Sequence, residues 1–235
     1  MSSEATTSRR AEVAAGVKAS LAAGLGMFPL GIAFGLLVLQ AGLPWWIAPA
    51  LSVTAYAGSL ELLLVGMMVA TTPLATIALT TFLVNFRHVF YAFTFPLNVV
   101  RNPIARAYSV YALTDESYAV TAAAPREWTS WRLLSTQIAF QAYWVGGGLA
   151  GVAIGSLLPQ RIEGLEFALC ALFVTLTLDA CRTKAQVPSL LLAGASFSLA
   201  VVATPDSALF TGLLLFVATL AVRYLINGRR KATDA

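Results

Sequence analysis

Five ionisable side chains lie inside long apolar stretches of this chain, and they are the residues whose types could carry out chemistry. A charged side chain at the centre of a membrane helix costs roughly 2.5–3.5 kcal/mol, so such residues usually mark a substrate or ion pathway. They also lie close to glycine, serine, asparagine and proline residues that interrupt the apolar stretches. The five residues are Glu61, Arg87, His88, Asp115 and Glu116.

These side chains could together bind a zwitterion such as an α-amino acid. Its carboxylate needs donors, which Arg87 and the N-termini of interrupted helices can supply. Its ammonium group needs an acceptor such as Glu61 or Asp115. Proton coupling needs a group that can change its charge, and Glu61, His88 and Asp115 are the candidates. The alternative is a structural ion pair between Arg87 and Glu61 or Asp115, which is compatible with a binding role.

Other classes of function fit the chain poorly. It has no Gly-x-Ser-x-Gly motif, and a Ser–His dyad that uses His88 has no support from the spacing. One histidine and two cysteines do not suffice for a structural zinc site. We therefore expect no enzyme, no metal and no cofactor. The net charge of +4 comes from basic residues in short loops and at the chain ends, which predicts a membrane protein rather than a nucleic-acid-binding one.

The composition predicts an all-α integral membrane protein. The 235 residues are 58% hydrophobic and 11% charged, whereas soluble domains carry about 25% charged residues. A span needs about 20 apolar residues, so we expect a polytopic bundle of seven or eight transmembrane helices, several of them broken near the midplane. The apolar segments are 17–41, 45–70, 73–97, 108–124, 132–158, 165–181, 187–204 and 208–226.

The number of spans depends on segment 108–124, which is short and carries Asp115 and Glu116 at its middle. In either case one membrane domain uses almost the whole chain. We expect a disordered cytoplasmic N-terminus over 1–15, a single transporter domain over 16–228 and a cytoplasmic tail over 229–235.

Three of the expected helices are interrupted by residues that break or polarise a helix. A proline in a membrane helix removes a donor and frees a carbonyl, and such breaks persist only where protein or a water-filled cavity satisfies the backbone. Many secondary transporters build their substrate sites from broken helices. A kink without function is the alternative. We predict a substrate site that comprises Pro29, Leu30, Gly31, Gly58, Ser59, Glu61, Asn85 and Arg87.

Small residues recur every four positions in two of the segments. Gly31 and Gly35 form one pair, and Gly147, Gly151 and Gly155 extend the same spacing in a second helix. Small residues at this interval let helices approach closely, so we expect a packing role. A polar face on the second helix could line a pathway or bind neighbouring helices; it comprises Gln137, Gln141 and Trp144.

The stretches that carry the interruptions resemble the AzlC family of branched-chain amino-acid transport proteins. The matching stretches are 26–35 (GMFPLGIAFG), 57–61 (AGSLE) and 83–88 (LVNFRH). The similarity extends from about residue 16 to about residue 225 and is strongest to a corynebacterial branch of the family, including 101–106 (RNPIAR) and 176–179 (LTLD).

The resemblance implies the large subunit of a two-component secondary transporter in the bacterial cell (inner) membrane. Its expected substrates are Val, Leu, Ile and methionine, exported at the expense of the proton gradient or the membrane potential. It also implies a small AzlD-type membrane subunit as partner, with membrane lipids around both. Many family members carry Gln where this chain has Glu61, so a coupling role for Glu61 would be limited to the branch with Glu. The alternatives are a passive amino-acid channel and an uptake permease for the same substrates.

The basic residues at the end of the chain predict a cytoplasmic C-terminus for either number of spans. Arg223, Arg229, Arg230 and Lys231 come at or after the end of the last apolar segment, and such residues favour the cytoplasmic side. A reporter that is active only in the periplasm, fused after residue 231, should therefore stay silent. A cytoplasmic reporter at the same position should be active, and the reverse pattern would overturn this topology.

Overall fold

The computed structural model describes residues 8–123, 128–158 and 186–233, together with a few isolated residues between 158 and 186. All regular structure within these ranges is helical, as predicted. Four of the described helical segments are long and apolar enough to cross a membrane: Arg9–Gln40, Leu74–Tyr91 (with a short turn at 86–87), Ser130–Leu157 and Ala208–Ile226. Most of predicted segment 165–181 lies outside the described residues, so the total number of spans stays a prediction.

The chain divides into two compact units. The first contains Met1–Thr72 and Val84–Leu165, and the second contains Pro73–Leu83 and Glu166–Ala235. All residues of the predicted substrate site belong to the first unit.

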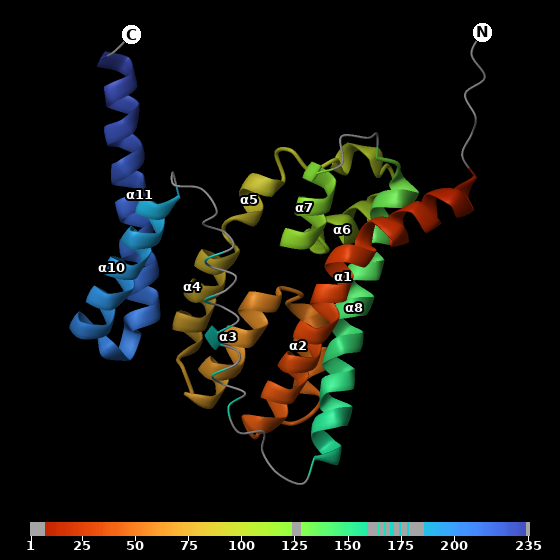
Figure 1. Ribbon diagram of the computed structural model, residues 1–235, viewed down its shortest axis with the longest axis horizontal. Coiled ribbons are helices and arrows are strands. Elements are labelled where there is room, and N and C mark those ends of the chain that lie inside the picture. Colours follow the sequence, from red (N-terminus) through yellow and green to blue (C-terminus); the bar gives the residue numbers. More distant parts are fainter. Residues whose placement is uncertain are drawn as a thin grey trace. The chain divides into compact units, whose positions relative to one another are not determined.

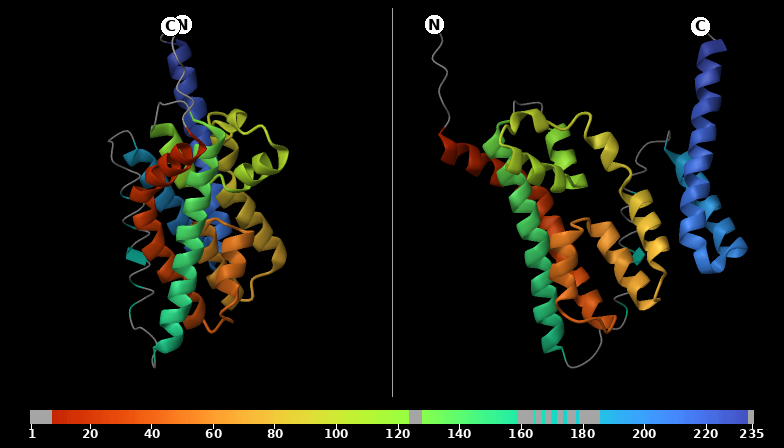
Figure 2. Two further views of the ribbon diagram at one scale, coloured as in Figure 1. Left: turned by 90° about the vertical axis from the view of Figure 1, so that its right-hand side faces the viewer. Right: turned by 180° about the vertical axis from the view of Figure 1, so that it is seen from behind.

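Two long helices, α1 (Arg9–Gln40) and α8 (Ser130–Leu157), form the centre of the first unit and lie side by side in Figures 1 and 2. They are parallel, because Gly16 lies against Ser135 near their beginnings and Gly155 lies against Leu39 near their ends. Their axes approach closely because Gly31 and Gly35 of α1 and Gly147 and Gly151 of α8 lie directly against the backbone of the other helix. The predicted packing role of the small residues is thereby confirmed.

The N-terminal part of α1 differs from the expectation of disorder over 1–15, because the helix begins at Arg9. Ser8 caps it with its side-chain oxygen. The Arg9 guanidinium lies 3.5 Å from the ring centroid of Trp131. Glu12 accepts a hydrogen bond of 2.8 Å from the Thr129 hydroxyl. The cap and these two contacts to the beginning of α8 hold a segment that composition alone marks as polar and unstructured.

The predicted break at Pro29–Gly31 is wrong, since α1 continues as an α-helix through Pro29. A proline inside a helix removes one backbone hydrogen bond. Here the helix is held against α8 beyond that point, where Gly31 and Gly35 both contact the α8 backbone. This continuous packing outweighs the loss of a single bond.

The predicted segment 45–70 is a helical hairpin rather than one span. It consists of α2 (Ile47–Thr54) and α3 (Gly58–Val69), between which the chain turns back (Figure 1). The turn contains Tyr56 with a positive φ of 42°, and the Tyr56 N–H donates to the Leu51 carbonyl at 3.2 Å. The interruption predicted at 57–59 is thus confirmed, but the two short helices are antiparallel.

A two-residue turn at 86–87 separates α4 (Leu74–Asn85) from α5 (His88–Tyr91), within the stretch 85–88 that the sequence marked only as polar. A short 3-10 helix, Leu97–Val99, then leads to α6 (Pro103–Tyr111) and α7 (Asp115–Ala123). The prediction of one continuous segment over 108–124 is therefore wrong.

The break between α6 and α7 is held by a side chain of α8. The buried Gln137 amide donates to the carbonyl of Ser109 at 2.8 Å and to the carbonyl of Ala112 at 3.0 Å. These bonds give donors to carbonyl groups at the break, of which that of Ala112 also accepts from the Thr114 N–H and the Ser117 hydroxyl, as backbone away from water requires. The break also places Asp115 and Glu116 in the first turn of α7.

In the second unit, α10 (Val187–Ala203) packs against α11 (Ala208–Thr233) after a short 3-10 turn, Pro205–Ser207. The guanidinium of Arg223 donates to the Ser189 hydroxyl at 2.7 Å. The helix α11 continues to Thr233, so most of the tail expected at 229–235 is helical. Arginine, lysine and alanine in this stretch are good helix formers, which favours the extension.

The close approach of α1 and α8 predicts that a single methyl group will destabilise the protein at one glycine of α1 and not at another. A Cβ at Gly35 would overlap the carbonyl oxygen of Gly148, whereas a Cβ at Gly26 would meet nothing within 4 Å. Gly35→Ala should therefore cost about 1–3 kcal/mol through overpacking. Gly26→Ala should be neutral or stabilising by up to about 1 kcal/mol. Thermal unfolding in detergent compares the two variants. Equal melting temperatures would contradict the close approach of α1 and α8 at Gly35.

Candidate functional site

The buried carboxylate of Glu61 is the centre of the first candidate cluster. Its Oε1 accepts a hydrogen bond of 3.0 Å from the backbone N–H of Ala57, and its Oε2 accepts one of 2.8 Å from the Ser52 hydroxyl. The indole N–H of Trp144 donates to both oxygens at 3.0 Å. Within the described part of the chain Glu61 forms no ion pair. Hydrogen bonds alone therefore compensate for its burial, as buried polar groups require.

The surroundings of Trp144 explain why the Glu61 cluster forms at this place. The Trp144 ring stacks on Phe34 of α1 with a centroid distance of 5.8 Å. On α3, a Cβ at Gly58 would lie 2.9 Å from the Trp144 ring, so only glycine lets the hairpin come this close. Gly31 in turn contacts the Trp144 carbonyl from α1. Glycines on two helices thus allow one tryptophan to reach the carboxylate.

Arg87 is the centre of the second cluster, which joins three interrupted helices. Its Nη2 forms an ion pair of 2.6 Å with Asp115 of α7 and donates to the Ser59 hydroxyl of α3 at 3.3 Å. Asp115 also accepts a hydrogen bond of 2.8 Å from the Tyr91 hydroxyl. The side chains of Arg87 and Asp115 are 43% and 42% exposed, so a small molecule can reach this pair.

The structure thus decides between the two ion pairs that the sequence left open. Arg87 pairs with Asp115 and not with Glu61. The two candidates on α3 also differ, because Ser59 is exposed and bonded to Arg87, whereas Glu61, two residues further along the helix, is buried.

The other predicted site residues lie in different surroundings. The Asn85 carbonyl is hydrogen-bonded to His88 Nδ1 at 2.9 Å, so both residues belong to the break that carries Arg87. Leu30 packs against the hydrophobic cluster around Trp144. Gly31 faces α8, and Pro29 is exposed on α1. The structure therefore does not bring Pro29 and Gly31 to Arg87.

A tyrosine network lies beside these clusters, and the sequence analysis missed it. The Tyr108 hydroxyl donates to Gln141 Oε1 at 2.9 Å, and Gln141 Nε2 donates to the Tyr111 hydroxyl at 2.9 Å. The Tyr111 hydroxyl donates to the Val53 carbonyl at 2.5 Å, at the end of α2. Tyr111 also packs on Tyr56 with a ring centroid distance of 5.5 Å. The spacing of tyrosines three residues apart on α6 was the available signal.

This arrangement defines a helical membrane protein whose polar centre is built from interrupted helices. Residues 22–158, which include every residue of the two clusters, match the family model described as AzlC protein. The chain belongs to the AzlC family.

The chain is also similar to several known membrane proteins. An uncharacterized membrane protein of Helicobacter pylori is 31% identical over 159 residues, which are 66% of this chain and 69% of that protein. The Bacillus subtilis branched-chain amino acid transport protein AzlC is 28% identical over 158 residues, 66% of this chain and 62% of that protein. The Escherichia coli inner membrane protein YgaZ is 27% identical over 179 residues, 72% of this chain and 73% of that protein. No solved structure matches the chain.

The hydrogen bonds of Glu61 predict opposite results for two substitutions. In Glu61→Gln, the amide oxygen can still accept from Trp144 and Ala57, and the amide nitrogen can donate to the Ser52 oxygen. This variant should keep its stability to within about 1 kcal/mol. Glu61→Ala leaves three donors unpaired, of which those of Ser52 and Trp144 are buried, and should cost about 3 kcal/mol or more. Melting curves followed by tryptophan fluorescence distinguish them, and equal destabilisation of both variants would contradict this account.

Proposed function

We propose that this chain is the large subunit of a two-component secondary transporter that exports Val, Leu, Ile and methionine across the bacterial inner membrane. The observation that carries the proposal is the exposed guanidinium of Arg87 beside Ser59 in the first turn of α3. The name of the Bacillus subtilis relative supports branched-chain amino acids as the substrates.

The carboxylate of the amino acid would bind where Arg87 and α3 meet. The first N–H groups of a helix have no intrahelical acceptor and favour an anion. In α3 these groups belong to Gly58, Ser59 and Leu60, next to the guanidinium. Asn85 adds a polar group from the neighbouring break. Glu61, buried on the same helix, holds the start of α3 in place through its bonds to Ser52 and Trp144. Leu30 and Gly31 support the same cluster from α1.

Asp115 and Glu61 are the strongest candidates for proton coupling, with His88 as a third. Asp115 and a substrate carboxylate would compete for one guanidinium, because Arg87 is paired with Asp115 when the site is empty. A proton on Asp115 would release Arg87 for the substrate. A proton on Glu61 would need an acceptor, and of its three partners only Ser52 can turn to accept.

The partner in this proposal is a small AzlD-type membrane subunit, which the family membership supports. The proposal is tested by loading vesicles that contain both subunits with radiolabelled leucine. Leucine should move against its concentration gradient when a proton gradient or a membrane potential is imposed. Vesicles that contain this chain alone should show little or no movement. Flux that only follows the leucine gradient would indicate a passive channel, and full transport by the chain alone would refute the two-component proposal.

Two variants in the same vesicles test the roles of the charged residues. Arg87→Lys keeps the charge but loses the planar fork of donors, so leucine transport should fall about tenfold or more. Arg106→Lys, an exposed position on α6, is the matched control and should transport normally. If Glu61 carries the proton, Glu61→Gln should lose the dependence on the proton gradient and keep leucine exchange. Undiminished, pH-dependent transport in both Arg87→Lys and Glu61→Gln would leave these charges as structural groups.

A further inference from the structure

We propose that Glu116, in the first turn of α7, binds the ammonium group of the transported amino acid together with the hydroxyl of Tyr56. This inference rests on the proposed function, since it assigns the second half of the same substrate site. The sequence analysis offered Glu61 and Asp115 for this role, and the structure gives reasons to prefer their neighbour.

Glu61 and Asp115 are already occupied by partners within the protein. Glu61 accepts hydrogen bonds from Ser52, Ala57 and Trp144 and is fully buried. Asp115 is paired with Arg87 through one oxygen and accepts the Tyr91 hydroxyl with the other. An ammonium group would have to displace these bonds to reach either carboxylate.

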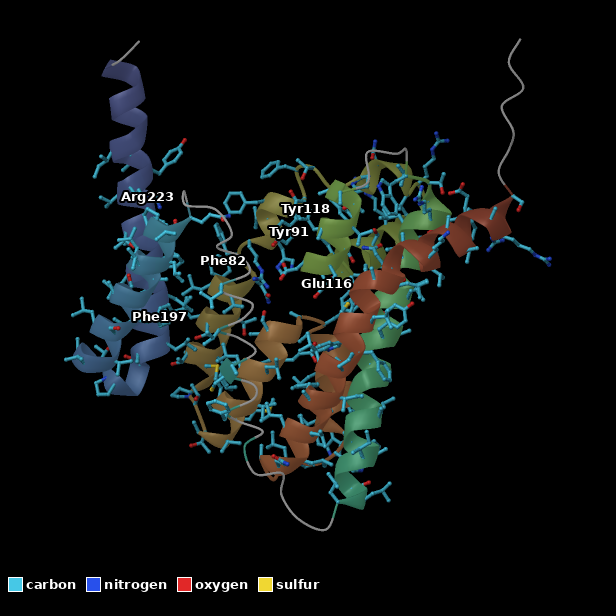
Figure 3. The ribbon with its side chains drawn as sticks, in the orientation of Figure 1. Phe82, Tyr91, Glu116, Tyr118, Phe197 and Arg223 are labelled. Carbon is cyan, nitrogen blue, oxygen red and sulfur yellow. The ribbon has the colours of Figure 1, made fainter. Side chains whose placement is uncertain are left out.

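Glu116 has no such partner within the part of the chain that the structure describes, and its side chain is half-buried. Figure 3 shows it at the end of α7 that faces the turn between α2 and α3. A carboxylate that is partly removed from water and unpaired favours a bound cation, because the ion pair replaces the lost hydration. Glu116 is therefore an available acceptor beside the pair of Arg87 and Asp115.

Tyr56 provides the second and independent observation. Its side chain is only 4% exposed, and its hydroxyl has no hydrogen-bond partner among the described residues. A buried hydroxyl without a partner costs about 1–3 kcal/mol, so a bound polar group is its natural complement. Tyr56 lies in the turn between α2 and α3, which is the turn that the Glu116 end of α7 faces in Figure 3. Tyr56 also has a positive φ of 42°, a conformation that is rare for a bulky residue and often found at functional sites.

These groups fit the geometry of an α-amino acid, whose ammonium and carboxylate are attached to one carbon atom. Arg87 contacts Asp115, and Glu116 follows Asp115 in the same first turn of α7, so a cationic group and a second carboxylate lie at the same end of this helix. The ring of Tyr111 packs on that of Tyr56 with a centroid distance of 5.5 Å and so adds aromatic surface next to the ring that carries the Tyr56 hydroxyl, and aromatic rings attract cations. The ammonium would donate to Glu116 and to the Tyr56 oxygen while Arg87 holds the carboxylate.

The test measures exchange of radiolabelled leucine in vesicles that contain both subunits, with two competitors. 4-Methylpentanoate is leucine without its ammonium group, and 3-methylbutylamine is leucine without its carboxylate. Glu116→Gln should raise the half-saturating leucine concentration about ten- to a hundredfold. It should also abolish inhibition by the amine and keep inhibition by the carboxylate. Arg87→Lys should weaken inhibition by the carboxylate and keep inhibition by the amine. Because both competitors are compared on one vesicle preparation, their ratio does not depend on the amount of folded protein.

Tyr56→Phe is the second variant, because it removes only the hydroxyl. It should raise the half-saturating leucine concentration about three- to tenfold. The melting temperature should not fall, since the lost hydroxyl had no partner among the described residues. The matched controls are Tyr143→Phe on α8 and Glu12→Gln near the start of α1, which should exchange leucine like the wild type.

The outcomes separate this inference from the proposed function. Wild-type vesicles that exchange no leucine would overturn the proposed function and this inference with it. Wild-type exchange combined with unchanged leucine half-saturation and unchanged amine inhibition in Glu116→Gln would overturn only the assignment of Glu116.

Discussion

Two interruptions, between α2 and α3 and between α6 and α7, leave backbone groups that must find partners away from water, and one face of α8 helps to supply them. Gln137 bonds the carbonyls at the break between α6 and α7. Gln141 holds Tyr111, which reaches the carbonyl of Val53 at the end of α2. Trp144 holds Glu61, which accepts the Ala57 N–H at the beginning of α3. Lipid cannot provide such bonds, so the polar centre depends on this face of α8.

The same dependence explains the glycines. Gly31 and Gly35 bring α1 against the α8 backbone, and Gly58 brings the hairpin against the Trp144 ring. A larger residue at any of these positions would move α8 away from the groups that its side chains bond. The helix packing and the polar cluster therefore depend on each other. Glycines allow the helices to come close, and at that distance the polar side chains of α8 can form their hydrogen bonds.

The sequence could predict what depends on local residue types and could not predict what depends on the path of the chain. Glycine and serine at 58–59 marked a true interruption, the polar stretch 85–88 coincides with a short turn that was not predicted, and the glycine spacing indicated close helix packing. Pro29 misled because packing on α8 keeps α1 helical around it. The hydrogen bond between Ser52 and Glu61 joins the two antiparallel helices α2 and α3. The periodicity of a single helix cannot predict it. Which carboxylate, Asp115 or Glu116, stays available for a substrate ammonium group depends on which of them pairs with Arg87. That pairing follows only from the three-dimensional structure.

The charges around the proposed substrate site also suggest why a zwitterion and a proton would be handled together. Arg87, Asp115 and Glu116 carry one positive and two negative charges when all are ionised. A zwitterion adds no net charge, so one negative charge stays unbalanced in a region where this is costly. A proton on Asp115 removes that charge and frees Arg87 at the same time. Under the proposed function, the loaded and protonated site is thus the nearly neutral one, which is the form best suited to a change of conformation within the membrane.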